Sequence, residues 1–256
     1  MTTMLRQRNL LIALTSAAVI AGVAGCDAPI TAHQIRSSTA GATTSPAPPA
    51  PPAGASSACA ALGGTIDAKQ TCRVQSATAT YKIDMSFPLD YPDPQAVTGF
   101  LTQDREQFVN WVAQYGQRDA RDRPFVYRVT AKTYRSGTPI LGTQSLVLEI
   151  DNDTGFAHQG HPDTTFQAFN YDLGKHVPIT FDTLFKPGTK PLEVLNPIVQ
   201  RKFDALPDDL DVHAYQNFAI TDDAVIFFFG QDQVVHDNGG PHQISVPRAV
   251  LPPLLA

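Results

Sequence analysis

Apolar and polar residues alternate at a period of two along several segments of the chain. Residues 81–87 place four apolar side chains between polar ones, a pattern that predicts a strand with one buried face. The alternating segments "FVYRVTAKTYRS" and "SLVLEIDND" flank the turn-like "SGTPILGT" and predict a β-hairpin. The segments "TFQAFNYDL", "NFAIT" and "AVIFFFG" continue the strand series. We therefore expect a sheet rich in antiparallel pairs.

A helical period replaces this alternation in "YPDPQAVTGFLTQDREQFVNWVAQYG". Asp93 and Pro94 supply an N-cap and a first-turn proline, and Gly116 supplies a stop. A second helix is predicted in "PLEVLNPIVQRKFDAL", where Pro197 should kink the helix or mark its start. The order of these elements predicts an α+β fold in a single main domain, with an antiparallel-rich sheet packed against the long helix.

The first 25 residues show a third pattern, an uncharged apolar run that follows two arginines. The run "LLIALTSAAVIAGVAG" is shorter than a bilayer span and is typical of a signal peptide. It ends in Val23-Ala24-Gly25-Cys26, which resembles the bacterial lipobox. The resemblance implies cleavage before Cys26 and attachment of diacylglycerol to the Cys26 thiol. Residues 1–25 are accordingly expected to be a lipoprotein signal peptide, with a plain secretory signal as the alternative.

Residues 26–58 are rich in Pro, Ala, Ser and Thr and contain no aromatic residue. Such a composition cannot bury enough apolar surface to offset the entropy lost on ordering. We expect a tether that separates the folded unit from the membrane.

The three cysteines of the chain are Cys26, Cys59 and Cys72. If Cys26 carries lipid, the other two form a pair, and an exported protein favours a disulfide between them. Residues 59–76 are therefore predicted to be a disulfide-stapled hairpin ahead of a main domain at residues 77–256. The stretch "CAALGGTIDAKQTC" also resembles a short module described as mannan-binding in mycobacterial sequences, so carbohydrate binding is an alternative to a structural staple.

Charge narrows the choice of partner. The chain has a formal net charge of -5 and lacks basic runs, which argues against binding to nucleic acid. A polybasic attachment to anionic lipids is equally unsupported. The membrane is therefore expected as a partner only through the lipid on Cys26.

Three blocks of sequence resemble one family. They are "FNYDLGKHVPITFDTLFKPGTKPLEVLNPIVQRKF", "FAITDDAVIFFFGQDQVV" and "ISVPRAVLPPLL". These blocks resemble the carboxy-terminal domain of the mycobacterial secreted immunogenic proteins of the MPT/MPB type, which is similar to the extracellular domain of the anti-sigma factor RsiV. The resemblance covers about residues 81–255 and implies a β-grasp-like element and an extracytoplasmic location. One departure is "QDQVVHDNGG", which stands where these relatives often carry a tyrosine-rich stretch.

Candidate catalytic groups are sparse. A serine hydrolase of the α/β-hydrolase type needs a G-x-S-x-G elbow, and the chain contains none. Ser136 and Ser145 are the serines that tertiary folding could bring to a base. Nucleotide-binding and zincin motifs are absent from the sequence. We therefore assign no catalytic residue, metal site or cofactor.

Four histidines lie in two glycine-containing segments, "GFAHQGHPD" and "VVHDNGGPHQI". With Asp163 and Asp237 they could converge on a metal, although their spacing matches no established signature. The simpler interpretation is a partner-facing or ligand-facing pair of loops that contains His158, His161, His236 and His242.

Together these features predict a cell-envelope lipoprotein on the extracytoplasmic face of the cell membrane. Its domain is expected to bind a cell-wall glycan or a host or other extracellular protein, as a surface antigen does. The alternative, implied by the family alone, is a weak carboxylesterase that acts on short acyl esters.

Overall fold

The computed structural model describes residues 54–116, 123–154, 163–203, 210–235 and 240–254. The predicted signal peptide, Cys26 and most of the predicted tether lie outside the described residues. No helix in these five segments is both long enough and apolar enough to cross a membrane.

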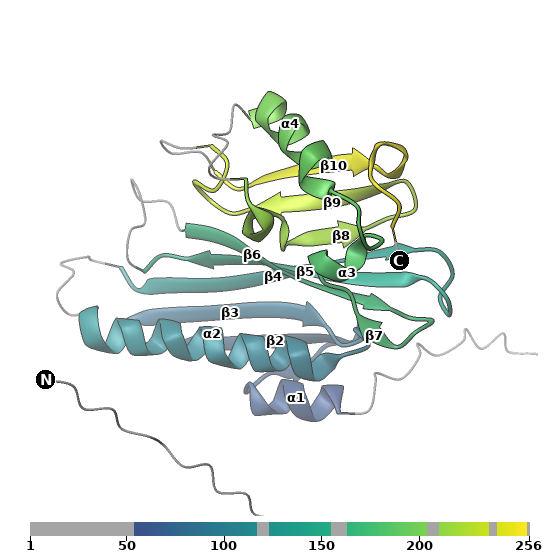
Figure 1. Cartoon of the computed structure of the whole chain (residues 1–256). Helices are drawn as coiled ribbons and strands as arrows, with labels where there is room; N and C mark the ends of the chain where they lie inside the picture. Colours follow the sequence, from purple (N-terminus) through teal and green to yellow (C-terminus); the bar gives the residue numbers. More distant parts are fainter. Residues whose placement is uncertain (1–53, 117–122, 155–162, 204–209, 236–239, 255–256) are drawn as a thin grey trace, which may run out of the picture. The chain divides into compact units, whose positions relative to one another are not determined.

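A seven-stranded sheet forms the centre of the fold (Figure 1). Its strands follow the order of the chain: β1 (Thr65–Ile66), β2 (Thr71–Ala77), β3 (Tyr81–Pro88), β4 (Phe125–Ser136), β5 (Thr143–Asn152), β6 (Asp163–Asp172) and β7 (Val177–Pro178). Neighbouring strands are antiparallel except β3 and β4, which run parallel. The predicted antiparallel-rich sheet is confirmed.

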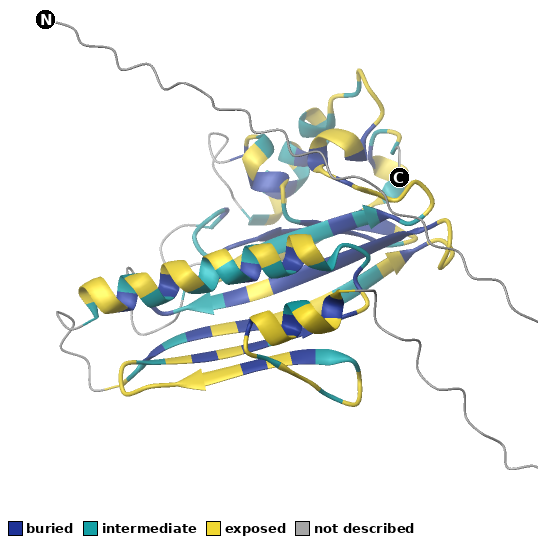
Figure 2. Ribbon diagram, turned by 90° about the horizontal axis from the view of Figure 1, so that it is seen from below, coloured by how far each residue is buried: buried dark blue, intermediate teal, exposed yellow. Residues whose placement is uncertain are grey.

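The parallel pair requires a crossover, and helix α2 (Pro94–Tyr115) provides it. The Asp93 carboxylate accepts a hydrogen bond from the Ala96 amide, and Gly116 is the C-cap, so both predicted ends of this helix are correct. The hairpins β2–β3 and β4–β5 flank α2, and this arrangement is the expected β-grasp-like element. Figure 2 shows α2 lying along one face of the sheet.

A core of buried side chains fills the space between α2 and this face. Phe108 of α2 contacts Tyr127 of β4 at 5.2 Å between ring centroids, and the Tyr127 hydroxyl donates a 2.6 Å hydrogen bond to Asp104. Burial and this hydrogen bond raise the pKa of Tyr127 well above its usual range, so it stays protonated. The pair fixes the long helix to the centre of the sheet.

A three-stranded sheet lies on the opposite face of the seven-stranded sheet (Figure 1). Its strands are β8 (Phe218–Ile220), β9 (Ala224–Phe229) and β10 (His242–Pro247), with β9 in the middle. Helices α3 (Phe181–Leu184) and α4 (Pro191–Phe203) pack on it, together with the short 3-10 helix Val212–Tyr215. A second 3-10 helix, Arg248–Val250, follows β10. The aromatic residues of this second core include Phe181, Tyr215, Phe218, Phe227 and Phe229. Helix α4 continues through Pro197 instead of starting there.

The two sheets meet at β5, which explains why residues 143–148 are all buried. Leu146, Leu148 and Ile150 face α2, whereas Val147 packs against Ala219 and Phe228 of the small sheet. Polar groups also cross the junction, because the Asn170 side chain donates to the Phe218 carbonyl at 2.9 Å. The second sheet was not predicted as a separate layer.

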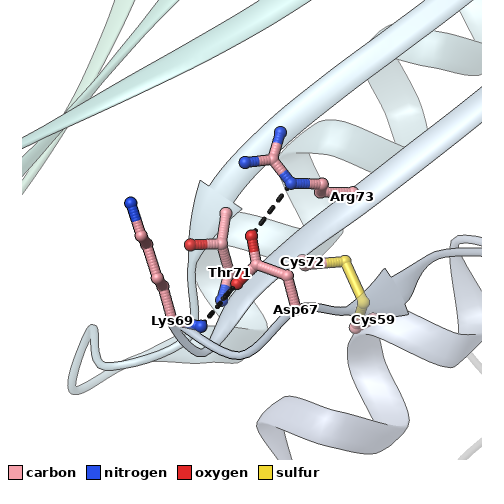
Figure 3. A network of polar contacts seen from close by, with 6 residues as sticks. All are labelled: Cys59, Asp67, Lys69, Thr71, Cys72 and Arg73. Atoms are coloured by element: carbon pink, nitrogen blue, oxygen red, sulfur yellow. Dashed lines mark hydrogen bonds and ion pairs between the residues drawn. A yellow bond between two sulfur atoms is a disulfide. The ribbon is translucent and has the colours of Figure 1, made fainter.

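Strands β1 and β2 pair around a turn at Asp67 and form the predicted hairpin, and a helix that was not predicted precedes them. Ala55–Ala61 form helix α1, so the last residues assigned to the tether are helical. The predicted disulfide joins Cys59 of α1 to Cys72 of β2, and therefore links a helix to the main sheet (Figure 3). Both cysteines are fully buried in the first core, so this segment is part of the main domain.

Gly64 is required beside this bond. A Cβ atom on Gly64 would lie 2.7 Å from the Cys72 sulfur and 2.8 Å from the Cys59 sulfur, closer than real contacts allow. Nearby, the Asp67 carboxylate accepts hydrogen bonds from the amides of Lys69 and Thr71 and from the Arg73 guanidinium (Figure 3). The glycine pair Gly63-Gly64 and Asp67 of "CAALGGTIDAKQTC" therefore have structural roles beside the disulfide, as expected of a structural staple.

Candidate functional site

A groove of about 480 Å³ opens between the two sheets. Its floor is the face of the seven-stranded sheet that does not carry α2, and its other wall is formed by β9 and the start of β10. Thr130, Lys132 and Tyr134 of β4 line it because alternate residues of a strand share a face. Val147 and Glu149 of β5 line it for the same reason.

Aromatic rings make up the apolar part of this inter-sheet groove. Phe228 of β9 contacts Phe166 of β6 at 5.4 Å and Tyr134 of β4 at 5.9 Å between ring centroids. The Lys132 ammonium lies 4.9 Å from the centre of the Tyr134 ring, within the range of a cation–π contact. The groove thus offers an aromatic surface with charged and polar groups at its edge, among them Glu149 and Gln243.

His242 lies at the start of β10 and lines the groove. Its ring packs 5.1 Å from the ring of Phe203 of α4, and its Nε2 is buried without a hydrogen-bond partner among the described residues. Of the four predicted histidines, the structure therefore brings His242 to the groove. His158, His161 and His236 lie outside the described residues, so their association with His242 stays a prediction.

The metal alternative gains no support from the described segments. Asp163 begins β6 and pairs with Asn152 of β5, and Asp237 lies outside the described residues. No group of three or more His, Cys, Asp or Glu side chains within the described ranges could hold a metal ion.

Ser145 has a structural position. It is fully buried on β5, and its hydroxyl accepts a 3.0 Å hydrogen bond from the Ile220 amide of β8. This bond joins the two sheets, so the Ser145 hydroxyl is already engaged and is closed to a substrate.

Ser136 belongs to a cluster at the end of β4. Its hydroxyl accepts a 2.9 Å hydrogen bond from the Arg248 guanidinium, and Asp222 also interacts with it. The hydrogen bond from the Gly137 amide, 2.7 Å long, is the main reason that the pKa of Asp222 is lowered. A lowered pKa makes a carboxylate a weaker general base. The cluster therefore connects the β4–β5 turn to the β8–β9 turn by hydrogen bonds, which indicates a structural role and not a hydrolytic centre.

The sequence did not reveal the groove residues Tyr134, Phe166 and Phe228. Tyr134 and Phe166 alternate with polar residues, which indicates only strands with one buried face, and Phe228 stands within the apolar run "AVIFFFG". The groove forms where β4, β5, β6, β9 and β10 lie close together. No local sequence motif predicts that these strands are neighbours.

Comparison with known proteins places the chain among mycobacterial relatives. A Mycobacterium tuberculosis protein named Esterase Rv3036c is 48% identical over 205 residues, which cover 77% of this chain and 88% of the relative. Immunogenic protein MPB64 of Mycobacterium bovis and immunogenic protein MPT64 of Mycobacterium tuberculosis are each 37% identical over 207 residues, with the same coverage. The chain belongs to the MPT64-type family. This confirms the resemblance seen in the sequence.

Part of this MPT64-type chain also matches a more widely defined domain. Residues 182–249 match the family described as "Protein of unknown function (DUF3298)", and they span α3, α4 and the small sheet. Crystal structures of DUF3298 family members from Bacteroides fragilis and Pseudomonas aeruginosa cover 73% and 74% of the chain and 91% and 94% of their own lengths. They align with TM-scores of 0.42 and 0.43 at 12% and 13% identity. These values are too low to carry a functional comparison.

Proposed function

We propose that this chain is a cell-envelope lipoprotein whose MPT64-type domain binds an extracytoplasmic ligand in the inter-sheet groove. The observation that carries the proposal is the groove itself, which is lined by three aromatic rings and has charged groups at its edge. Ligand sites are typically concave and apolar, with a few polar groups that orient the ligand.

A glycan fits this surface better than a fully apolar ligand. A sugar ring has an apolar C–H face that packs on aromatic rings, and its hydroxyls need donors and acceptors. Lys132, Glu149 and Gln243 offer both kinds of group at the edge.

The lipid anchor is the second part of the proposal. The lipobox-like sequence before Cys26 supports it, and so does the disulfide, because such bonds persist mainly in exported proteins. The thiol of Cys26 is the one cysteine that the disulfide leaves for acylation.

Two measurements test these parts separately. Titration of the purified protein with soluble mannan should give saturable binding, and Tyr134→Ala should weaken it roughly fivefold. Tyr115→Ala, at the end of α2 and outside the groove, is the matched control. Equal losses in the two variants would contradict binding in the groove.

The anchor is tested in cells by radiolabelled palmitate. The wild type should incorporate label and partition into detergent, and Cys26→Ala should do neither, because the acyl chains supply the membrane affinity. Equal labelling of both proteins would exclude lipidation at Cys26.

An esterase activity is the second candidate, because the relative at 48% identity is named an esterase. Hydrolysis of short-chain p-nitrophenyl esters by the purified protein tests it. Turnover lost in Ser136→Ala with an unchanged melting temperature would favour the enzyme. A loss in Ser145→Ala alone would instead reflect the hydrogen bond that this serine contributes between the sheets.

A further inference from the structure

Two large aliphatic side chains are exposed to solvent at the turn between β4 and β5. Ile140 and Leu141 are each 76% exposed, the largest values among the exposed large hydrophobic residues of the described segments. Neither belongs to one of the two main cores or to the inter-sheet groove. Their exposure therefore has no explanation in the packing of the domain.

Other exposed aliphatic residues lie at the same end of the seven-stranded sheet. Val177 is 44% exposed and sits on β7, two strands from the start of β5. Val250 is 51% exposed and follows Arg248, which donates its hydrogen bond to Ser136 at the end of β4. We call Ile140, Leu141, Val177 and Val250 the apolar end. Exposed apolar groups gathered in this way mark an interaction site more often than single ones do.

The turn that carries Ile140 and Leu141 is held firmly. The Gly142 amide donates to the Thr138 carbonyl at 2.8 Å, and the Leu141 amide donates to the Thr138 hydroxyl at 3.0 Å. A Cβ atom on Gly142 would lie 1.9 Å from the Ser136 carbonyl oxygen, so only glycine fits there. Because the turn is already ordered, covering it with another surface costs little conformational entropy.

The chain enters the domain at this same end. Figures 1 and 2 both show the start of α1 at the end of the sheet where the β4–β5 and β6–β7 turns lie. Gly54 is the N-cap of α1, and the segment that leads from Cys26 arrives there. A lipid on Cys26 would therefore be connected to the domain at the apolar end.

We propose that the apolar end rests on the membrane, with Ile140 and Leu141 inserted into the lipid interface. This position differs from two expectations drawn from the sequence, that the tether holds the domain away from the membrane and that the lipid on Cys26 is the only membrane contact. This inference rests on the proposed lipid anchor, which raises the effective concentration of lipid beside the turn so that a small apolar tip suffices. Opposite charges are paired at this end, where Lys175 contacts Asp172 at 2.7 Å and Arg135 contacts Asp90 at 2.8 Å. Binding should therefore need neither anionic lipids nor low salt.

Tryptophan quenching tests the contact directly. The chain from Cys26 onward is coupled through the Cys26 thiol to a maleimide lipid in phosphatidylcholine vesicles whose acyl chains carry bromine. Ile140→Trp should lose roughly half of its added fluorescence, since its ring would reach the acyl boundary. Tyr115→Trp, 38% exposed in the native protein and located at the far end of α2, should lose none. The wild type, with Trp111 as its sole tryptophan, supplies the background.

A second variant guards against insertion caused by the added tryptophan. Here the chain is coupled at Cys26 to a single myristoyl chain, which by itself gives only marginal, reversible membrane binding. In this form, the variant with Ile140→Ser and Leu141→Ser should sediment with phosphatidylcholine vesicles roughly tenfold less than the wild type, at an unchanged melting temperature. Tyr115→Ser should sediment like the wild type.

Equal quenching of the two tryptophans, quenching of neither, or an unchanged sedimentation of the double-serine variant would each overturn the proposal. The lipid is attached chemically in the quenching experiment, so its result does not depend on lipidation in the cell. Failure of the anchor, seen by palmitate labelling, is thus distinguishable from failure of the apolar end.

Discussion

The two sheets of this domain are stabilised in different ways. The seven-stranded sheet, with α1 and α2, forms a first region that has a long capped helix, a disulfide and extensive strand pairing. The three-stranded sheet, with α3 and α4, forms a second region whose strands have only three to six residues. The second region compensates with a dense cluster of aromatic rings around Phe227, which contacts Phe181, Tyr215 and Phe218.

This difference indicates that the second region depends on the first. A small sheet needs a large apolar surface to be stable in water, and here part of that surface is β5 of the first region. Ser145 and Asn170 add hydrogen bonds across the same junction. We therefore expect the two regions to unfold together.

The largest expected effect comes from the aromatic cluster. Phe227→Ala should lower the free energy of unfolding by about 3–5 kcal/mol, because it leaves a cavity among fully buried rings. Urea titration followed by Trp111 fluorescence checks this, since Trp111 lies on α2 in the first region. A Trp111 transition that stayed at the wild-type urea concentration would show that the regions unfold independently.

Reduction of the disulfide probes the first region. Breaking the Cys59–Cys72 bond should lower the free energy of unfolding by about 3 kcal/mol, because a short loop is no longer closed in the unfolded chain. Urea titration of the Cys59→Ser, Cys72→Ser double variant measures the loss, with Cys26→Ser as the matched control. A loss confined to α1, with the Trp111 transition unmoved, would contradict the place of this bond in the main core.

Ser145→Ala tests the junction itself. The variant leaves the Ile220 amide buried without its partner and should cost about 1–3 kcal/mol. Ser76→Ala, on the exposed part of β2, should change the melting temperature little. Equal shifts in the two variants would mean that the hydrogen bond between the sheets contributes nothing.

The smallest expected effect is a change in how the melting temperature depends on pH in acid. Hydrogen bonding, first from the Thr71 amide, lowers the pKa of Asp67 below its ordinary value of 3.8. The stability that this ionised carboxylate contributes is present above pH 3.8 and is lost as the pH falls through the lowered pKa. Asp67→Asn should therefore make the melting temperature less sensitive to acid below that pH, whereas Ser76→Ala on β2 should leave that sensitivity unchanged. Melting curves from pH 2 to 6 make the comparison, and identical pH profiles for the wild type and Asp67→Asn would refute it.

Local signals predicted the first region well. Asp93, Pro94 and Gly116 mark the ends of α2, and the alternating segments around "SGTPILGT" mark the β4–β5 hairpin. Helix α1 was missed because its residues, "ASSACAA", share the composition of the preceding tether. What orders them is the bond to Cys72 and the contact of the Arg105 side chain with the Leu62 carbonyl, neither of which is local.

The groove could not be predicted in the same way. The groove residues Lys132, Tyr134, Phe166 and Phe228 come from two strands of one sheet, β4 and β6, and from one strand of the other, β9. Their proximity follows from the way in which the two sheets stack, a property that alternation along a single strand does not contain. His242 was selected for its type and spacing, and its position in the groove gives that choice a geometric basis.

The link from α1 to β2 also determines how the domain would bear a mechanical load. If the chain is held in the membrane through Cys26, a pulling force reaches the fold at Gly54 and meets Cys59 within the first turns of α1. The covalent bond passes that force to β2, whose ladder with β3 extends over seven residue pairs. Without the bond, the pulling force would first detach α1 from the domain. The force would then act on the sheet at its two-residue edge strand β1. In the intact protein, shear along a long antiparallel ladder must be overcome before the domain opens.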